Sequence, residues 1–259
     1  MNKINLKKVP EITLLFWIMK ITATTLGETA GDLMSMTLKV GYGISSLIFI
    51  GFFIVVLIAQ LVAKKYIPAL YWSVIVATST AGTTMSDYMD RTLGLGYLYG
   101  SLILITILIS ILVIWYKTEK TLSVTDIKTF RPEAFYWTAI LFSNTLGTAL
   151  GDFLADDSGL GFGGGALVIG GALLLIVLAY FFTNISRIIL FWIAFVLTRP
   201  FGATFGDLLT KTHEKGGYDF GTKGSSLILF SILVILVIYT SLTKNSRALK
   251  PITEVNTST

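Results

Sequence analysis

The chain of 259 residues contains no cysteine and one histidine, His213. Without cysteine there is no disulfide, no thiolate metal site and no cysteine nucleophile. A single histidine leaves no plausible Ser-His-Asp set and no zinc-binding His-Glu-x-x-His motif. We therefore expect neither enzymatic activity nor a cofactor, and we interpret His213 as an ordinary loop residue.

Charged residues are also scarce, at 14% against 54% hydrophobic residues, and the mean hydropathy is +0.77. Crossing the hydrocarbon core of a membrane takes about 20 apolar residues. Runs of this kind predict an all-α membrane protein with lipid around it and eight transmembrane helices, at roughly 12–34, 43–63, 69–89, 97–116, 134–155, 164–183, 186–209 and 224–243. We expect one membrane domain over residues 1–259, with a cytoplasmic tail at 244–259.

The basic residues are unevenly placed. Thirteen of them fall before odd-numbered or after even-numbered predicted helices, whereas the opposite loops hold Lys39, Arg91, Lys211, Lys215 and Lys223. The positive-inside rule then predicts that both termini lie in the cytoplasm. This placement also explains the net charge of +5 without a nucleic-acid partner. Lysines before the first apolar run resemble a secretory signal, but that run carries the repeat motif described next, so we expect it to be retained.

One motif occurs four times. An aromatic-Trp pair is followed ten residues after the Trp by a glycine, and five residues later by an aspartate. The pairs are Phe16-Trp17, Tyr71-Trp72, Tyr136-Trp137 and Phe191-Trp192, the glycines Gly27, Gly82, Gly147 and Gly202, and the aspartates Asp32, Asp87, Asp152 and Asp207. We predict four parallel two-helix repeats, at about 10–65, 66–117, 131–183 and 186–243, pseudo-symmetric about the membrane normal.

This fourfold Trp-x9-Gly-x4-Asp spacing resembles a family of bacterial integral membrane proteins described as a repeat of unknown function. The resemblance covers roughly residues 10–243. It implies the eight-helix architecture and a location in the bacterial inner membrane, and it implies no activity, so a function has to be argued from the residues.

Two stripes follow from placing the motif on helices at 100° per residue. A small-xxx-small stripe favours close helix packing, at Gly27, Gly31, Gly82, Ser86, Gly147, Gly151, Gly202 and Gly206. The other stripe carries hydroxyls and the aspartates. Its hydroxyls are candidate ion ligands, although each could instead bond to its own helix backbone: Thr25, Thr29, Thr80, Thr84, Thr145 and Thr204.

The aspartates are the strongest functional signal. An intramembrane carboxylate costs at least a few kcal/mol and usually marks an ion or proton pathway. Glu28 joins the four aspartates as a fifth acidic candidate, and within the predicted helices only Lys20 and Arg199 can pair with them. The negative charge of three carboxylates then has to be neutralised by protonation or by a bound cation. Oxygen ligands suit hard ions such as Mg²⁺, Ca²⁺ or Mn²⁺.

The repeats differ at two positions. Lys20 has apolar counterparts, and the position three before the glycine reads Thr24, Ser79, Asn144 and Arg199. We interpret Lys20 and Arg199 as charge partners of the carboxylates or as tethered cations, and Asn144 as a further ion-binding candidate. Either cation could instead snorkel or form a structural bridge.

We thus expect a transporter or exporter of a hard cation, with Mn²⁺ the first candidate and Glu28 and the four aspartates as its ligands. Two alternatives remain open, a proton- or sodium-coupled carrier of another small solute and a membrane scaffold whose aspartates only fix helix ends. Intramembrane aspartyl proteases do not fit, because their Gly-x-Gly-Asp motif needs a glycine where this chain has Thr29, Thr84, Ala149 and Thr204.

Overall fold

The computed structural model describes residues 8–127 and 129–248. These residues form eight α-helices and no strand, which confirms the all-α prediction. The lysines Lys3, Lys7, Lys128 and Lys250, and the tail beyond residue 248, lie outside the described residues. The helices are α1 (Leu14–Asp32), α2 (Tyr42–Val62), α3 (Pro68–Asp87), α4 (Gly96–Glu119), α5 (Phe130–Asp152), α6 (Gly161–Phe182), α7 (Arg187–Thr210) and α8 (Thr222–Ala248).

Each predicted apolar run coincides with one helix, and local chemistry sets several ends. The Thr13 hydroxyl accepts a hydrogen bond from the backbone N–H of Phe16 and caps α1. Pro68 occupies the first turn of α3, where its missing N–H has no helical partner to lose. Gly96 and Gly161 have positive φ angles at the starts of α4 and α6, which a residue with a Cβ adopts only under strain.

The first three repeats share an irregularity directly after the aspartate. A five-residue π-helical turn follows Asp32, Asp87 and Asp152, and α7 continues past Asp207 without one. In the first such turn the backbone N–H of Leu38 donates to the carbonyl of Leu33 at 2.8 Å. π-Helical turns are rare and often occur at functional sites, so their repetition beside the aspartates draws attention to that end of the molecule.

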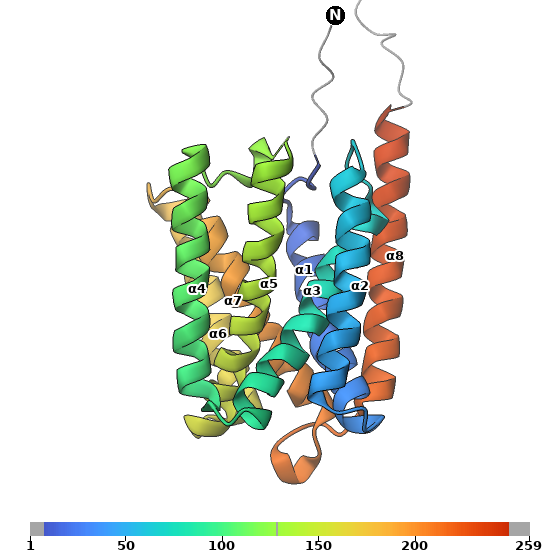
Figure 1. The fold of residues 1–259 in the computed structure, drawn as a ribbon, viewed down its shortest axis with the longest axis vertical. Helices are drawn as coiled ribbons and strands as arrows, with labels where there is room; N and C mark the ends of the chain where they lie inside the picture. Colours follow the sequence, from blue (N-terminus) through green and yellow to red (C-terminus); the bar gives the residue numbers. More distant parts are fainter. Residues whose placement is uncertain (1–7, 128, 249–259) are drawn as a thin grey trace, which may run out of the picture.

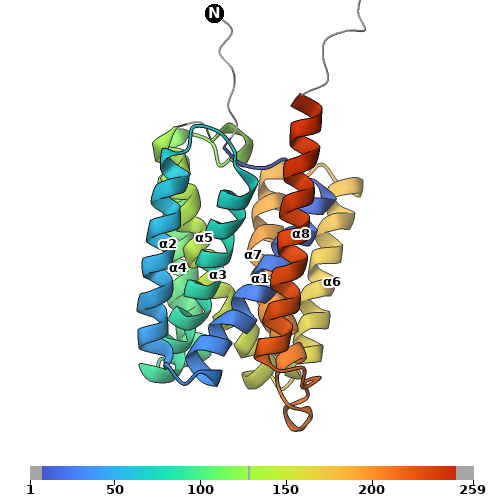
Figure 2. The same ribbon diagram turned by 90° about the vertical axis from the view of Figure 1, so that its right-hand side faces the viewer.

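The helices form two layers around one axis. The inner helices α1, α3, α5 and α7 pack in a closed ring, each against the next, with α7 against α1. Each outer helix covers the inner helix of the following repeat: α2 lies on α3, α4 on α5, α6 on α7 and α8 on α1. Figure 1 shows the start of α1 and the end of α8 toward the same end of the bundle, and Figure 2 shows α1 crossing obliquely behind α8.

The outer surface is apolar. Leu47, Leu167 and Phe181 are among many large hydrophobic side chains that α2, α4, α6 and α8 expose. Five helices, α2, α4, α6, α7 and α8, are long and apolar enough to cross a membrane. Because apolar side chains on the outside and polar ones inside are what a lipid environment selects, the chain has the character of a membrane protein.

Candidate functional site

The ring axis is lined by five layers of side chains. On each inner helix they recur every four residues, from the first aromatic of the Trp pair to the aspartate, and all are buried. We call the two ends of the bundle the aromatic end and the aspartate end. The layers are Phe16, Tyr71, Tyr136 and Phe191; Lys20, Ile75, Ile140 and Phe195; Thr24, Ser79, Asn144 and Arg199; Glu28, Thr83, Thr148 and Ala203; and Asp32, Asp87, Asp152 and Asp207.

The repeated glycines let this axis form. A Cβ added to Gly27 would lie 2.3 Å from the Cβ of Ser79, and one added to Gly147 would lie 2.3 Å from the Cγ of Arg199. The same contact recurs around the ring, from Gly82 to Asn144 and from Gly202 to Thr24. The glycine stripe is therefore where each inner helix receives the axial side chain of the next one.

Arg199 lies at the centre of the ring, with none of its surface exposed. Its Nη2 donates to Glu28 on α1 at 2.9 Å, to Thr148 on α5 at 2.7 Å, and to the hydroxyl of Thr83 on α3. One side chain of α7 thus contacts all three other inner helices. The ion pair with Glu28 agrees with the role of charge partner expected for Arg199.

Lys20 is equally buried, but the side chains in direct contact with its ammonium group are neutral. Its Nζ lies 3.4 Å from Oδ1 of Asn144 and 4.0 Å from the centre of the Phe195 ring. The amide nitrogen of Asn144 in turn donates to Thr78 at 2.9 Å and to Ser79 at 3.2 Å. The described contacts of Lys20 include no carboxylate within salt-bridge distance, so its expected pairing with an acidic residue is not found there.

The four aspartates form two bridged pairs. Arg91 lies between Asp87 and Asp152, with nitrogen-to-oxygen distances of 3.0 and 2.9 Å. Lys211 lies between Asp207 and Asp32, at 3.1 and 2.5 Å. A shift of 120 residues relates Arg91 to Lys211. At this end the fourfold repeat is therefore arranged as two similar halves, one from repeats two and three and the other from repeats four and one.

The two bridging cations correct the charge count made from the sequence. That count places Arg91 and Lys211 in loops and omits them, although each follows an aspartate by four residues, the spacing at which helical side chains meet. Burial alone would lower the pKa of Lys211, but the carboxylates of Asp207 and Asp32 outweigh it and raise that pKa, so the lysine stays charged. Four cations then face five carboxylates, and the deficit is one instead of three.

One group of carboxylates has the spacing of a cation site. Oxygens of Glu28, Asp32 and Asp207 lie within 4.8 Å of one another, and all three residues are buried. Asp87 and Asp152 lie outside this group, on Arg91. The five acidic candidates therefore do not share one point.

The threonine stripe does not join the aspartates on the axis. Thr80, Thr84, Thr145 and Thr204 donate to carbonyls of their own helices, as the alternative interpretation held. Thr29 accepts a hydrogen bond from Ser226 on the outer helix α8 at 2.9 Å. Thr25 has no hydrogen-bond partner among the described residues. The axial hydroxyls lie one position earlier, and a role of the stripe threonines as ion ligands stays a prediction.

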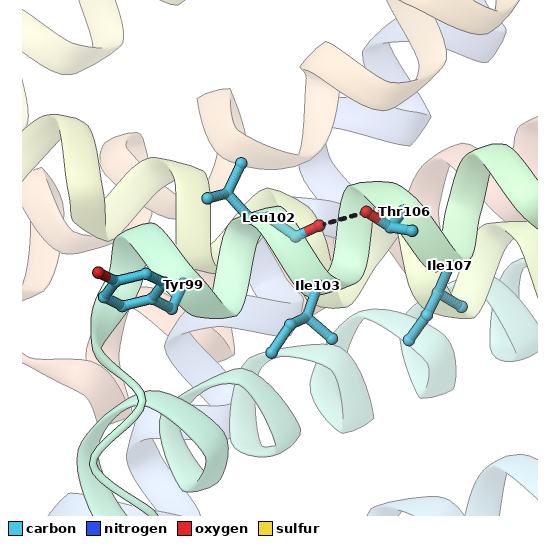
Figure 3. Close-up of a pocket in the computed structure, with 5 residues that line it drawn as sticks. All are labelled: Tyr99, Leu102, Ile103, Thr106 and Ile107. Carbon is cyan, nitrogen blue, oxygen red and sulfur yellow. Dashed lines mark hydrogen bonds between the residues drawn. The ribbon is translucent and has the colours of Figure 1, made fainter.

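The axis opens at the aspartate end. A cavity of about 360 Å³ there is lined by Arg91, Lys211, Asp207 and the loop residues Asp156 and Lys215, among others. A second hollow, of about 410 Å³, lies on α4 between Tyr99 and Ile107; Figure 3 shows its aliphatic side chains, with the hydroxyl of Thr106 bonded to its own helix. Only the first has charged walls, so it is the candidate entrance to the axis.

The aromatic end is closed. The hydroxyls of Tyr71 and Tyr136 lie 2.5 Å apart, and the rings of Phe16 and Phe191 are 6.4 Å apart. Beside them, the nearly buried Lys8 pairs with Glu133 at the start of α5. Gln60 on α2 also donates to Glu133, at 3.1 Å. Glu133 was not identified from the sequence because it occurs in only one repeat.

Comparison with protein families adds one finding. The family model described as Repeat of Unknown Function (DUF347) matches four segments, residues 15–66, 70–121, 135–186 and 190–246. The chain belongs to the DUF347 repeat family. The resemblance noted from the Trp-Gly-Asp spacing is thereby confirmed. No curated protein and no solved structure matches the chain.

One DUF347 repeat in the sequence does not correspond to one pair of packed helices in the structure. Each matched segment contains an inner helix and the outer helix that follows it, yet that outer helix packs on the inner helix of the next DUF347 repeat. Four such repeats close into a ring because the last outer helix, α8, covers the first inner helix, α1. The site on the axis therefore needs all four repeats.

Proposed function

We propose that this DUF347 protein is an ion-coupled transporter in which the aspartate layer binds a proton or a sodium ion. The observation that carries the proposal is the composition of each bridged pair, two buried carboxylates and one cation. An unneutralised carboxylate inside a membrane protein is costly, so each half of the layer favours one additional positive charge.

Eight membrane spans fit this proposal. Helices α1, α3 and α5 lie in the inner ring with α7, and their polar side chains line the axis. With α2, α4, α6 and α8 around them, polar residues on the axis side do not meet lipid. The basic residues near the aromatic end, including Lys64, Lys117 and Arg187, support a cytoplasmic location for that end and for both termini in the bacterial inner membrane.

Lys211 suggests how ion binding can be coupled to a structural change in the aspartate layer. Its ammonium lies between Asp32 and Asp207 and borders the charged cavity, and its side chain is 16% exposed. A cation entering from the cavity competes with this ammonium for the same oxygens. Binding one ion and releasing the lysine from one aspartate keeps the buried charge balanced.

A divalent metal such as Mn²⁺ is the second candidate. It is favoured by the spacing of Glu28, Asp32 and Asp207, whose oxygens are close enough to share one ion. Arg199 and Lys211 already neutralise two of these three charges, which makes a monovalent ion the better match.

The test uses the full chain with the substitution Asp207→Asn, purified and reconstituted in liposomes beside the wild type. The substitution leaves Asp32 and Lys211 as a neutral ion pair, so we expect a normal folded yield. It removes the surplus carboxylate of the half bridged by Lys211, so stabilisation by sodium or by acid should weaken to what the Arg91 half alone supplies, and ion flux driven by a gradient should fall by about tenfold or more. Thermal unfolding and flux are measured across sodium, proton and Mn²⁺ concentrations.

Asp219→Asn, an exposed aspartate in the last loop, is the matched control and should behave as the wild type. A response to Mn²⁺ alone, lost in Asp207→Asn, would replace the monovalent ion by a divalent metal. Absence of any ion response in the wild type, with unchanged yield in the variant, would overturn transport and favour the scaffold.

A further inference from the structure

The middle of the axis has the opposite charge balance from its aspartate end. Lys20 and Arg199 are fully buried there, and Glu28 is the one carboxylate paired with either of them among the described contacts. With Lys20 protonated, Lys20, Arg199 and Glu28 together carry one surplus positive charge. Such a charge inside a membrane protein is as costly as a surplus negative one and favours a bound partner of opposite sign.

Both cations have unused hydrogen-bond donors. Nε and Nη1 of Arg199 have no hydrogen-bond partner among the described residues, although the whole side chain is inaccessible. The Lys20 ammonium has three protons, and its recorded acceptor, Asn144, is 3.4 Å away. Buried donors are almost always satisfied, so several unsatisfied ones on two cations indicate an absent acceptor.

The two cations belong to one polar region. Asn144 contacts Lys20 and donates to Ser79, and the backbone carbonyl of Ser79 lies 3.5 Å from Nη2 of Arg199. The Phe195 ring, in the same layer as Lys20, has its centre 4.0 Å from Nζ of Lys20. The layer of Lys20 is otherwise apolar, and the next layer toward the aspartates, which holds Arg199 and Asn144, is polar.

We propose that Lys20 and Arg199 bind a small monovalent anion, which is the solute carried together with the ion of the aspartate layer. This inference rests on the proposed function, whose coupling ion it complements. A single negative charge cancels the surplus, and a small size follows from complete burial. Carboxylates such as acetate and inorganic anions such as chloride or nitrate share this chemistry.

The first test is a titration of the purified full chain with acetate, chloride, nitrate and gluconate as sodium salts, at constant sodium concentration and ionic strength. We expect the thermal unfolding temperature to rise saturably with one or more of the small anions and not with the bulky gluconate. The anion whose effect saturates at the lowest concentration identifies whether the site prefers a carboxylate or an inorganic anion. An equal response to all four anions would overturn the proposal.

The second test compares Lys20→Ile, Lys20→Arg and Lys39→Ala. Isoleucine stands at the equivalent position of two other repeats, so it suits the packing there. We expect Lys20→Ile to weaken anion binding by about tenfold or more, because a charged hydrogen bond is lost. Lys20→Arg should retain binding, and Lys39→Ala, in an exposed loop, should match the wild type. Equal binding by Lys20→Ile and wild type would contradict the proposal, and should Lys20→Ile fail to fold, the wild-type titration still decides.

The two proposals fail separately. Asp207→Asn should weaken the sodium or proton response and keep anion binding at fixed pH. A wild-type chain that responds to sodium or acid but binds none of the small anions overturns the anion site and leaves the ion-coupled transporter standing. Anion binding without any cation response overturns the coupling and leaves the anion site.

Discussion

Arg199 joins the four inner helices through a single guanidinium group. Its partners Glu28, Thr148 and Thr83 come from three different helices, and the group is shielded from both water and lipid. Breaking a buried ion pair by removing one partner typically costs about 3–5 kcal/mol, because the remaining charge stays buried without compensation. The pair is therefore a sensitive point in the stability of the ring.

We expect Glu28→Gln and Arg199→Met each to lower the free energy of unfolding by about 3 kcal/mol, and the double variant to lose less than the sum of the two. Reversible unfolding in a detergent mixture, followed by tryptophan fluorescence, measures this cycle. Strictly additive losses would mean that the two side chains do not depend on each other.

At this scale the sequence was informative where the repeats differ. Lys20 and Arg199 stood out because their equivalents in the other repeats are uncharged, and Arg199 has an acidic partner in the structure. Arg91 and Lys211 follow the apolar runs, a position typical of loop residues, so the apolar pattern does not indicate them as charge partners. Their distance of four residues from an aspartate was the available signal.

Among the elements, the segment before α1 is held at the aromatic end by contacts that no repeat motif encodes. Lys8 donates to the backbone carbonyl of Leu61 at 3.0 Å and pairs with Glu133, which Gln60 also contacts. The last turn of α2 and the first turn of α5 are thereby tied to the segment before α1. Glu133 is 1% exposed, so its charge depends on these partners.

Glu133→Gln should release this segment. We expect a lysine-specific protease to cleave at Lys8 about tenfold faster or more in the variant, since a charged hydrogen bond contributes roughly 1.5–3 kcal/mol. Mass spectrometry of the products over time gives the rate. Glu119→Gln, at the end of α4, is the control. Equal rates in Glu133→Gln and wild type would show that the ion pair does not hold the segment.

The helices themselves were well predicted, whereas the face of each helix that lines the axis was not. Both stripes of the inner helices carry small or hydroxyl-bearing residues, and hydroxyls bonded to their own helix leave no trace in the sequence. The axis follows a spacing of four residues from Thr24 through Glu28 to Asp32, and this row drifts around a straight helix by about 40° per step. The row can follow a straight axis when the helix is inclined to it, and Figure 2 shows α1 inclined in this way.

The whole molecule is one ring with two chemically distinct ends. Aromatic side chains and the Lys8 contacts close one end, and carboxylates with a charged cavity occupy the other. The loops at the aspartate end follow odd-numbered helices, and those at the aromatic end follow even-numbered ones. The proposed orientation can therefore be tested by labelling a few loops.

Because the chain has no cysteine, single-cysteine variants report one position each. We expect Lys39→Cys and Ser158→Cys to react with a membrane-impermeant maleimide in intact spheroplasts, because these loops lie at the aspartate end. Lys64→Cys and Lys120→Cys should react only after permeabilisation. The reverse pattern would place the termini outside the cell and contradict the orientation, and labelling of all four in intact cells would contradict eight spans.

The packing of each outer helix on the inner helix of the next repeat bears on biogenesis. During synthesis no outer helix packs on α1 until the final helix, α8, has been made. The first helix to be synthesised is therefore the last to gain its outer neighbour. Insertion machinery has to shelter the outer side of α1, including Thr29, until α8 and its Ser226 have been made. A circular permutant that starts at another repeat boundary keeps every neighbour and changes only which inner helix waits.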